Sequence, residues 1–179
     1  MSGTGSGDPN DTIQTGDAEL PLDAPARRRL PALLRRAWYG LNQTFRRRIA
    51  YTDLTPDQFT ILRNLVDGPE TGVTQTELSA LMSSDPNTIA SLLNRMQAAK
   101  LVERRPHEAD KRAHRVCILP KGVNLYRELR QIALELQGEL LAVLPESRRE
   151  QFLADLETVA DACLSSANAK ARGKKSARM

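Results

Sequence analysis

Five polar side chains between residues 87 and 95 share one face of a predicted helix, residues 86–99, and are of types that can hydrogen-bond to nucleic acid. They are Asn87, Thr88, Ser91, Asn94 and Arg95. Short hydrogen-bonding groups near a helix start can reach base edges in a major groove, and a longer cation further along suits a phosphate. Ordinary amphipathic helices carry similar polar faces, so this helix alone leaves both interpretations open. The other face carries apolar residues at i, i+3, i+4 and i+7, namely Ile89, Leu92, Leu93 and Met96.

A charged segment, residues 107–113, follows this helix and lies between two short runs suited to β-strands, 101–106 and 114–119. The pattern predicts a β-hairpin whose tip carries Asp110, Lys111 and Arg112. An arginine at such a tip can enter a minor groove, where the negative potential is strong. Asp110 can pair with Arg112 and orient it, although an exposed pair adds little stability. A second short helix is predicted just before residue 85, and two short helices joined by a tight turn and followed by this hairpin predict a winged helix-turn-helix.

Capping and proline signals delimit the other elements. A capping box of Thr55 and Gln58 opens a helix over about 56–66, a second box of Thr74 and Glu77 opens a short helix, and Asp85 precedes the helix that begins at residue 86. We expect the starts of these helices to offer free N–H groups to phosphates. Apolar periodicity predicts further helices over about 27 or 31 to 50, 120–144 and 147–165. The order α-α-α-α-β-β-α-α predicts a mainly α (α+β) fold.

The charge is unevenly distributed along the chain. The net charge is +4, yet the acidic residues 1–26 contain no Lys or Arg, and the basic residues 169–179 contain no Asp or Glu. We expect 1–26 to be a disordered leader and 168–179 a disordered tail, with one folded domain over 27–167. The basic balance suits a polyanionic partner, and solubilising charge is an equally good explanation.

Several functional classes are disfavoured by what the sequence lacks. It has no apolar run long enough to span a membrane, no secretory signal, and two cysteines only, Cys117 and Cys163. We therefore expect a cytoplasmic protein without disulfides. No phosphate loop, metal-ligand spacing or activated nucleophile is present, so we expect no enzyme, metal or cofactor. His107 and His114 make a poor metal site.

The span from residue 54 to 122 resembles the MarR family of bacterial transcriptional regulators. Each matching motif is weak by itself, but their order and spacing agree with the family, and the flanking helices agree in position and length. The motifs are residues 54–59 (LTPDQF), 76–78 (TEL), 85–88 (DPNT), 94–96 (NRM), 101–104 (LVER), 110–112 (DKR) and 118–122 (ILPKG).

The resemblance implies a homodimer on double-stranded DNA. Helices at about 27–50 and 120–165 would form the dimerisation region, and the lobes at about 54–119 would bind successive major grooves of a pseudo-palindrome. Family members mostly repress, and many release DNA when a small aromatic acid or phenol binds. By position, Asn87, Thr88 and Ser91 would read bases, Arg95 would lie near the backbone, and Arg112 would enter the minor groove.

Three residues depart from the family pattern. Ser91 stands where a longer polar or basic side chain is common, which weakens the case for direct base reading. Lys100 replaces a glycine after the recognition helix, and a positive φ there costs on the order of 1 kcal/mol. Leu119 replaces a capping threonine, for which Pro120 partly compensates by fixing φ.

The first helix carries the residues that an effector would need in this family. An aromatic acid could bind aromatic rings there, with an arginine for its carboxylate. The alternative is that Trp38 and Phe45 belong to the dimer or lobe core, and Tyr39 is balanced between the two roles. The candidates are Arg35, Trp38, Tyr39, Phe45 and Arg46.

Two other functions stay open. A cysteine-based redox regulator is conceivable, but residues 27–60 contain no cysteine, and Cys163 reads as a small apolar packing residue. A helical protein–protein adaptor without DNA binding is the alternative from another functional class.

Overall fold

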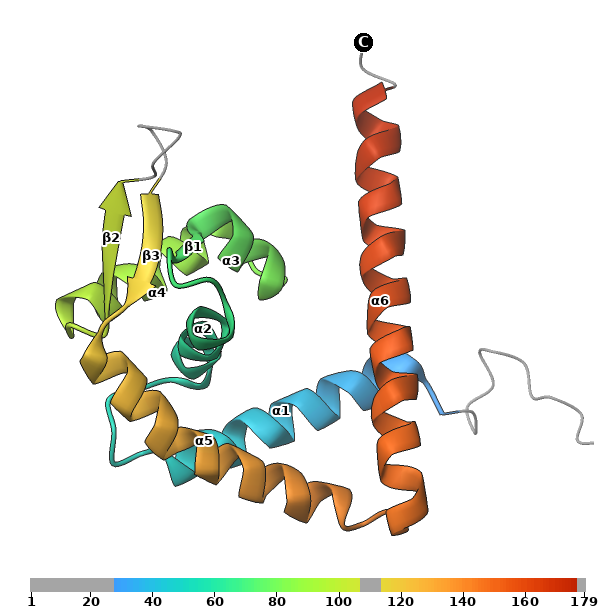
Figure 1. The fold of residues 1–179 in the computed structure, drawn as a ribbon. Coiled ribbons are helices and arrows are strands. Elements are labelled where there is room, and N and C mark those ends of the chain that lie inside the picture. Colours follow the sequence, from blue (N-terminus) through green and yellow to red (C-terminus); the bar gives the residue numbers. More distant parts are fainter. Residues whose placement is uncertain (1–27, 107–113, 177–179) are drawn as a thin grey trace, which may run out of the picture. The chain divides into compact units, whose positions relative to one another are not determined.

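The computed structural model describes residues 28–106 and 114–176 (Figure 1). The chain divides into two compact units, Met1–Leu41 and Asn42–Met179. Helix α1 (Leu30–Arg48) begins in the first unit and ends in the second. The elements that follow are α2 (Pro56–Asp67), β1 (Val73–Thr74), α3 (Gln75–Leu81), α4 (Pro86–Ala98), β2 (Val102–Pro106), β3 (His114–Ile118), α5 (Pro120–Leu141) and α6 (Glu146–Ser176).

The helices of the winged lobe begin where the local signals place them. Thr55 Oγ1 accepts from the N–H of Gln58 while the Gln58 side chain accepts from the N–H of Thr55, and Thr74 and Glu77 form the same reciprocal pair. Both predicted capping boxes are therefore confirmed. Leu119, as expected, makes no side-chain cap at the start of α5.

The sheet has a third strand that the sequence analysis missed. β1 pairs antiparallel with β3, which pairs antiparallel with β2, giving the order β1-β3-β2. Val73 lies opposite Val116, and Gly72 turns the chain into β1 with φ of +87°. A two-residue strand carries no alternating pattern of its own, so only its pairing with β3 defines it.

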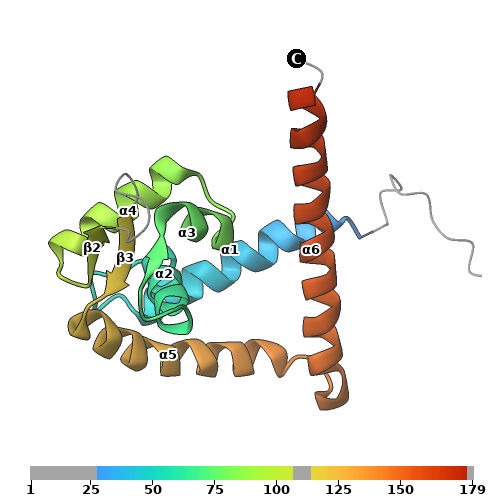
Figure 2. The same ribbon diagram turned by 45° about the horizontal axis from the view of Figure 1, so that its top comes forward.

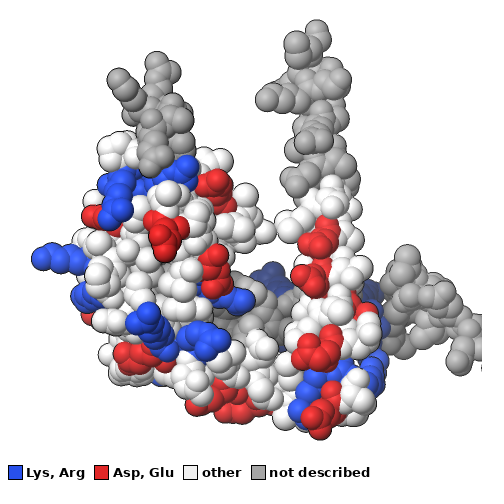
Figure 3. Space-filling model, in the orientation of Figure 1, with Lys and Arg blue, Asp and Glu red and all other residues white. Residues whose placement is uncertain are grey.

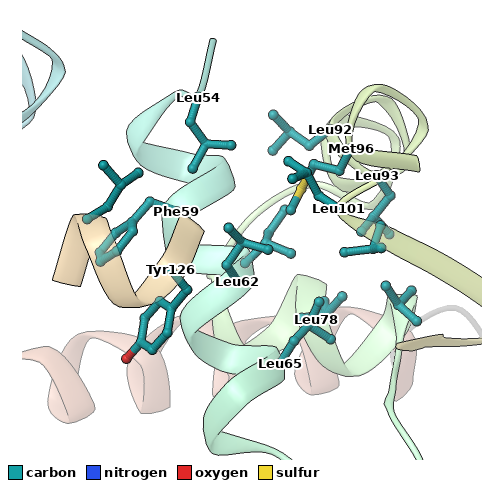
Figure 4. Packing of buried hydrophobic residues seen from close by; sticks show 14 of the residues in the cluster. Leu54, Phe59, Leu62, Leu65, Leu78, Leu92, Leu93, Met96, Leu101 and Tyr126 are labelled. Carbon is teal, nitrogen blue, oxygen red and sulfur yellow. The ribbon is translucent and has the colours of Figure 1, made fainter. Parts of the chain in front are cut away.

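The core of the second unit lies between α2, α4, α5 and the sheet (Figures 1 and 2). Ile61, Leu62 and Leu78 are completely buried in it. Phe59 packs against Phe45 and Tyr126, with ring centroids 4.9 and 5.7 Å apart. Figure 4 shows α2 running through the middle of this cluster, so the helix-turn-helix elements rest on one continuous apolar base.

Both helices of the helix-turn-helix end in the same backbone motif. After α3, Ser83 has φ of 47°, and the N–H of Ser84 donates to the Ser79 carbonyl at 3.0 Å. After α4, Lys100 has φ of 58°, and the N–H of Leu101 donates to the Met96 carbonyl at 2.9 Å. These are Schellman motifs, in which glycine is the usual left-handed residue. Lys100 thus adopts the positive φ whose cost was considered from its place at a glycine position of the family.

The last two helices differ from their expected bounds. α5 ends at Leu141 rather than near 144, and α6 continues to Ser176, well past the expected end near 165. Residues 168–179 were predicted to be a disordered tail because they contain few apolar residues. Much of that segment is Ala, Lys and Arg, which have high helix propensity, and this favours continuation of the helix. Within the described residues, no helix is both long and apolar enough to cross a membrane.

Candidate nucleic-acid interface

Helix α4 has one buried and one exposed face, as its sequence predicts. Ile89 and Met96 are completely inaccessible to solvent, and Leu92 and Leu93 are nearly so. Because that stripe is anchored in the core, the opposite face is held rigidly at the surface. The five residues predicted to read DNA are all exposed on it: Asn87, Thr88, Ser91, Asn94 and Arg95.

The first turn of α4 is capped by a carboxylate. Asp85 Oδ1 accepts from the N–H of Asn87 at 2.8 Å and from that of Thr88 at 3.3 Å. The expectation of free N–H groups at this helix start is therefore wrong for these two amides, because the cap already uses them. The negative Asp85 also offsets the positive end of the helix dipole. The start of α4 therefore offers an anion less positive potential than an uncapped helix would.

Two side-chain contacts fix the ends of the exposed face. Gln75 of α3 donates from Nε2 to the carbonyl of Pro86 at 3.1 Å, which ties the start of α3 to the start of α4. Arg95 donates from Nε to the carbonyl of Ser91 at 3.4 Å. The Arg95 stem thus follows the helix, and its exposed guanidinium keeps its terminal nitrogens for other acceptors.

Arginines populate the two strands that lead to the predicted hairpin tip. Arg104 of β2 donates to Gln97 Oε1 of α4 at 2.7 Å, Arg105 pairs with Glu103, and Arg115 of β3 donates to the Gly72 carbonyl at 3.0 Å. Basic side chains gather at this end of the lobe (Figure 3). The tip residues Asp110, Lys111 and Arg112 lie outside the described residues.

Three supporting residues were not found from the sequence. Gln97, Arg104 and Lys121 connect α4 to β2 and to α5, through the Gln97–Arg104 contact and a bond from Lys121 Nζ to the carbonyl of Ala99 at 3.0 Å. Each contact joins residues in different elements. No short-range spacing in the sequence signals them, since their partners are set by how α4, β2 and α5 pack.

The predicted effector residues on α1 fall into two groups. Phe45 is buried in the core, in agreement with the alternative that assigned it to packing. Trp38 and Tyr39 are 63% and 61% exposed in the single chain, and Arg35 and Arg46 are exposed as well. Trp38 is therefore not part of the core of the single chain.

The cysteines and His114 do not form a reactive cluster. Cys117 is buried, and its thiol donates to the carbonyl of Thr71 at 3.5 Å. Cys163 is exposed in the single chain, so the prediction that it packs as a small apolar residue is wrong for the isolated chain. His114 is exposed and His107 lies outside the described residues. In the described ranges, no three His, Cys, Asp or Glu side chains come together as a metal site.

Comparison with known proteins gives a consistent match. The MarR family model matches residues 52–113. The transcriptional regulator HosA of Escherichia coli O127:H6 is 30% identical over 127 residues, which span 68% of this chain and 93% of HosA. The Bordetella bronchiseptica BpsR structure is 25% identical, with a TM-score of 0.68, over 74% of this chain and 94% of BpsR. The S. aureus MepR–DNA complex has a TM-score of 0.70 at 22% identity, over 76% of this chain and 99% of MepR.

The family model covers most of the winged lobe, and the HosA match, at 127 residues, is longer than that lobe. The chain belongs to the MarR family of transcriptional regulators. Members of this family are non-enzymatic DNA-binding proteins, and this chain has their winged-helix fold.

Proposed function

We propose that this protein is a homodimeric repressor that binds a pseudo-palindromic operator and is released from it by a small effector, a phenol or an aromatic acid. The observation that carries the DNA-binding part is the exposed face of α4, where five hydrogen-bonding side chains stand over a fully buried apolar stripe. The S. aureus MepR structure, which shares the fold, was determined in complex with DNA.

The side chains of α4 divide by length and position. Asn87 and Thr88 lie in the first turn and Ser91 one turn further on, so these short side chains are proposed to contact base edges. Asn94 and Arg95 follow, and the Arg95 guanidinium suits a phosphate. Asp110, Lys111 and Arg112 of the hairpin tip are proposed to reach the adjacent minor groove.

The direct test is selection of bound sequences from a random DNA pool, followed by affinity measurements on the selected operator. Asn87→Ala should lower discrimination between the operator and a copy with one changed base pair by roughly fivefold or more, as expected when a base contact is lost. Asn124→Ala is the matched control, because Asn124 is an exposed asparagine on α5. Equal discrimination in the two variants would show that Asn87 makes no base contact.

Salt dependence separates DNA binding from the adaptor alternative. Affinity for the operator should fall steeply as salt rises, by close to one unit of log–log slope for each phosphate contact. Arg112→Ala should weaken binding and reduce that slope while the dimer stays intact. An absence of DNA affinity at low salt would favour the adaptor.

Dimerisation is proposed from apolar side chains that the single chain leaves exposed. Burying a contiguous apolar surface is the usual driving force for stable association. Light scattering should give a mass twice the 19.9 kDa of the chain. The exposed apolar residues on α5, α6 and the connection between them are Leu134, Leu140, Val143, Phe152, Leu156 and Leu164.

The effector proposal rests on exposed aromatic and basic residues of α1 and on one relative. DNA binding by BpsR is regulated by 6-hydroxynicotinic acid. Trp38 is the sole tryptophan, so its fluorescence reports directly on ligand binding near α1. A panel of aromatic acids should include one that quenches the Trp38 fluorescence and releases the protein from the operator. Arg35→Met or Arg46→Met should lower the affinity of the protein for that acid. Release without any change in Trp38 emission would place the ligand elsewhere.

A further inference from the structure

The end of the recognition helix α4 is attached to the start of α5 by a charged side chain. Lys121, in the first turn of α5, donates from Nζ to the carbonyl of Ala99, the C-cap residue of α4, at 3.0 Å. The last carbonyls of a helix have no partners within the helix and carry its partial negative charge. An ammonium group at this position therefore satisfies a carbonyl and is stabilised by the helix dipole.

The backbones of the two elements are also in close contact at this joint. The N–H of Leu119 donates to the carbonyl of Leu101 at 2.9 Å. Gly122 packs so tightly that a Cβ added there would lie 2.4 Å from that same carbonyl oxygen. Residues 99–101 and 119–122 thus form an interlocked joint, which we call the α4–α5 joint.

The buried stripe of α4 fixes the body of the helix in the core, so the contacts of the joint act on its C-terminal end. Beyond the backbone bond from Leu119, an attachment at Ala99 restrains that end further. Lys121 supplies this attachment from α5, and Gln97 supplies another on the neighbouring turn through Arg104 of β2. Both side chains hold the end of α4 that lies away from its capped first turn.

We propose that Lys121 is a positioning residue that fixes the angle of α4 relative to α5 and thereby sets the half-site spacing that the dimer accepts. This inference rests on the proposed function, in which α5 belongs to the dimerisation region and each α4 reads one half-site. With the angle fixed, the separation of the two reading helices is defined. Without the Lys121 bond, the end of α4 is held less tightly against α5, and we expect operators of other spacing to be tolerated better.

The experiment measures affinity for the selected operator and for copies with one base pair added or removed between the half-sites. Wild-type protein should prefer the selected spacing. Lys121→Met keeps the apolar stem and removes the donor, and it should lower that preference by roughly threefold to tenfold, the net effect of losing one typical exposed hydrogen bond. Lys121→Arg restores a donor and should recover most of the preference.

Arg127→Met is the matched control, because it removes the same charge from an exposed position on the same helix. If Lys121 acted only as a charge for DNA, both Met variants would weaken all three operators equally and leave the preference unchanged. If Lys121 contributed only to stability, the urea midpoint of Lys121→Met would fall and its preference for the selected spacing would stay the same as in the wild type. Either result would overturn the proposal.

Failure of the proposed function and failure of the positioning role of Lys121 give different results in this experiment. Absence of operator binding, or of any spacing preference, in the wild-type protein would contradict the proposed function itself. A wild-type preference that Lys121→Met retains in full would contradict the positioning role alone.

Discussion

Replacing Lys100 by glycine should make the protein more stable than the wild type. It occupies the left-handed region at φ of 58°, directly after α4. The N–H groups of Lys100 and Leu101 donate to the carbonyls of Gln97 and Met96 at 3.0 and 2.9 Å, which holds Lys100 in that conformation. Its exposed side chain takes no part in the core. Lys100→Gly should therefore relieve strain without loss of packing.

The magnitude follows from two opposing terms. The left-handed conformation costs an L-residue about 1–2 kcal/mol relative to glycine. Glycine in turn loses about 0.4–1 kcal/mol through the greater freedom of its unfolded chain. The free energy of unfolding should rise by about 0.5–1 kcal/mol. Lys100→Ala is the control, because it removes the same side chain but keeps the Cβ that causes the strain.

Urea unfolding checks this prediction at a single protein concentration, since stability depends on concentration if the protein is a dimer. The midpoint should rise for Lys100→Gly and stay close to wild type for Lys100→Ala, with the same slope in both. Equal midpoints in the two variants would refute the reasoning, because the Cβ would then carry no cost.

Three further predictions concern the cap, the joint and the ionised contacts. Asp85→Ala should lower the free energy of unfolding by about 1 kcal/mol in urea melts, whereas Asp85→Ser, which can still cap α4, should lose less. Gly122→Ala should lower the free energy of unfolding by about 1–3 kcal/mol, because its Cβ would meet the Leu101 carbonyl. Gly138→Ala is the control, because a Cβ at Gly138 on the same helix meets nothing within 4 Å. An unchanged urea midpoint for Gly122→Ala would contradict the close contact. Hydrogen bonds from Arg48 hold the pKa of Glu139 below its ordinary value of 4.5, so their stabilisation is present above that pH and is lost as the pH falls through the lowered pKa. In an NMR titration, Arg48→Met should return the pKa of Glu139 toward 4.5, and an unmoved value would mean that Arg48 is not the cause.

The parts of the fold that were predicted well depend on contacts within one helical turn. The capping boxes at Thr55 and Thr74 join residues three apart in the chain, and the Asp85 cap acts over two or three. The buried stripe of α4 follows from helical periodicity alone. The positive φ of Lys100 was considered from the glycine that the family places there.

The errors have equally specific causes. The free amides expected at the start of α4 are occupied because the Asp85 carboxylate that marks the helix start also bonds them. Cys163 was expected to pack because cysteine is usually buried, but it is exposed in the single chain. The end of α6 was placed too early because the small number of apolar residues after residue 167 was given more weight than their helix propensity.

The sequence by itself determined where the helices of the winged lobe begin and which face of α4 is exposed, because hydrogen bonds and side-chain periodicity within a few residues decide both. Only the tertiary structure decided the pairing of β1 with β3 and the attachment of α4 to α5. Val73 meets Val116, and Lys121 reaches Ala99 across 22 residues, because packing of the core brings these segments together. Such contacts depend on the relative placement of whole elements, which no short pattern in the chain encodes.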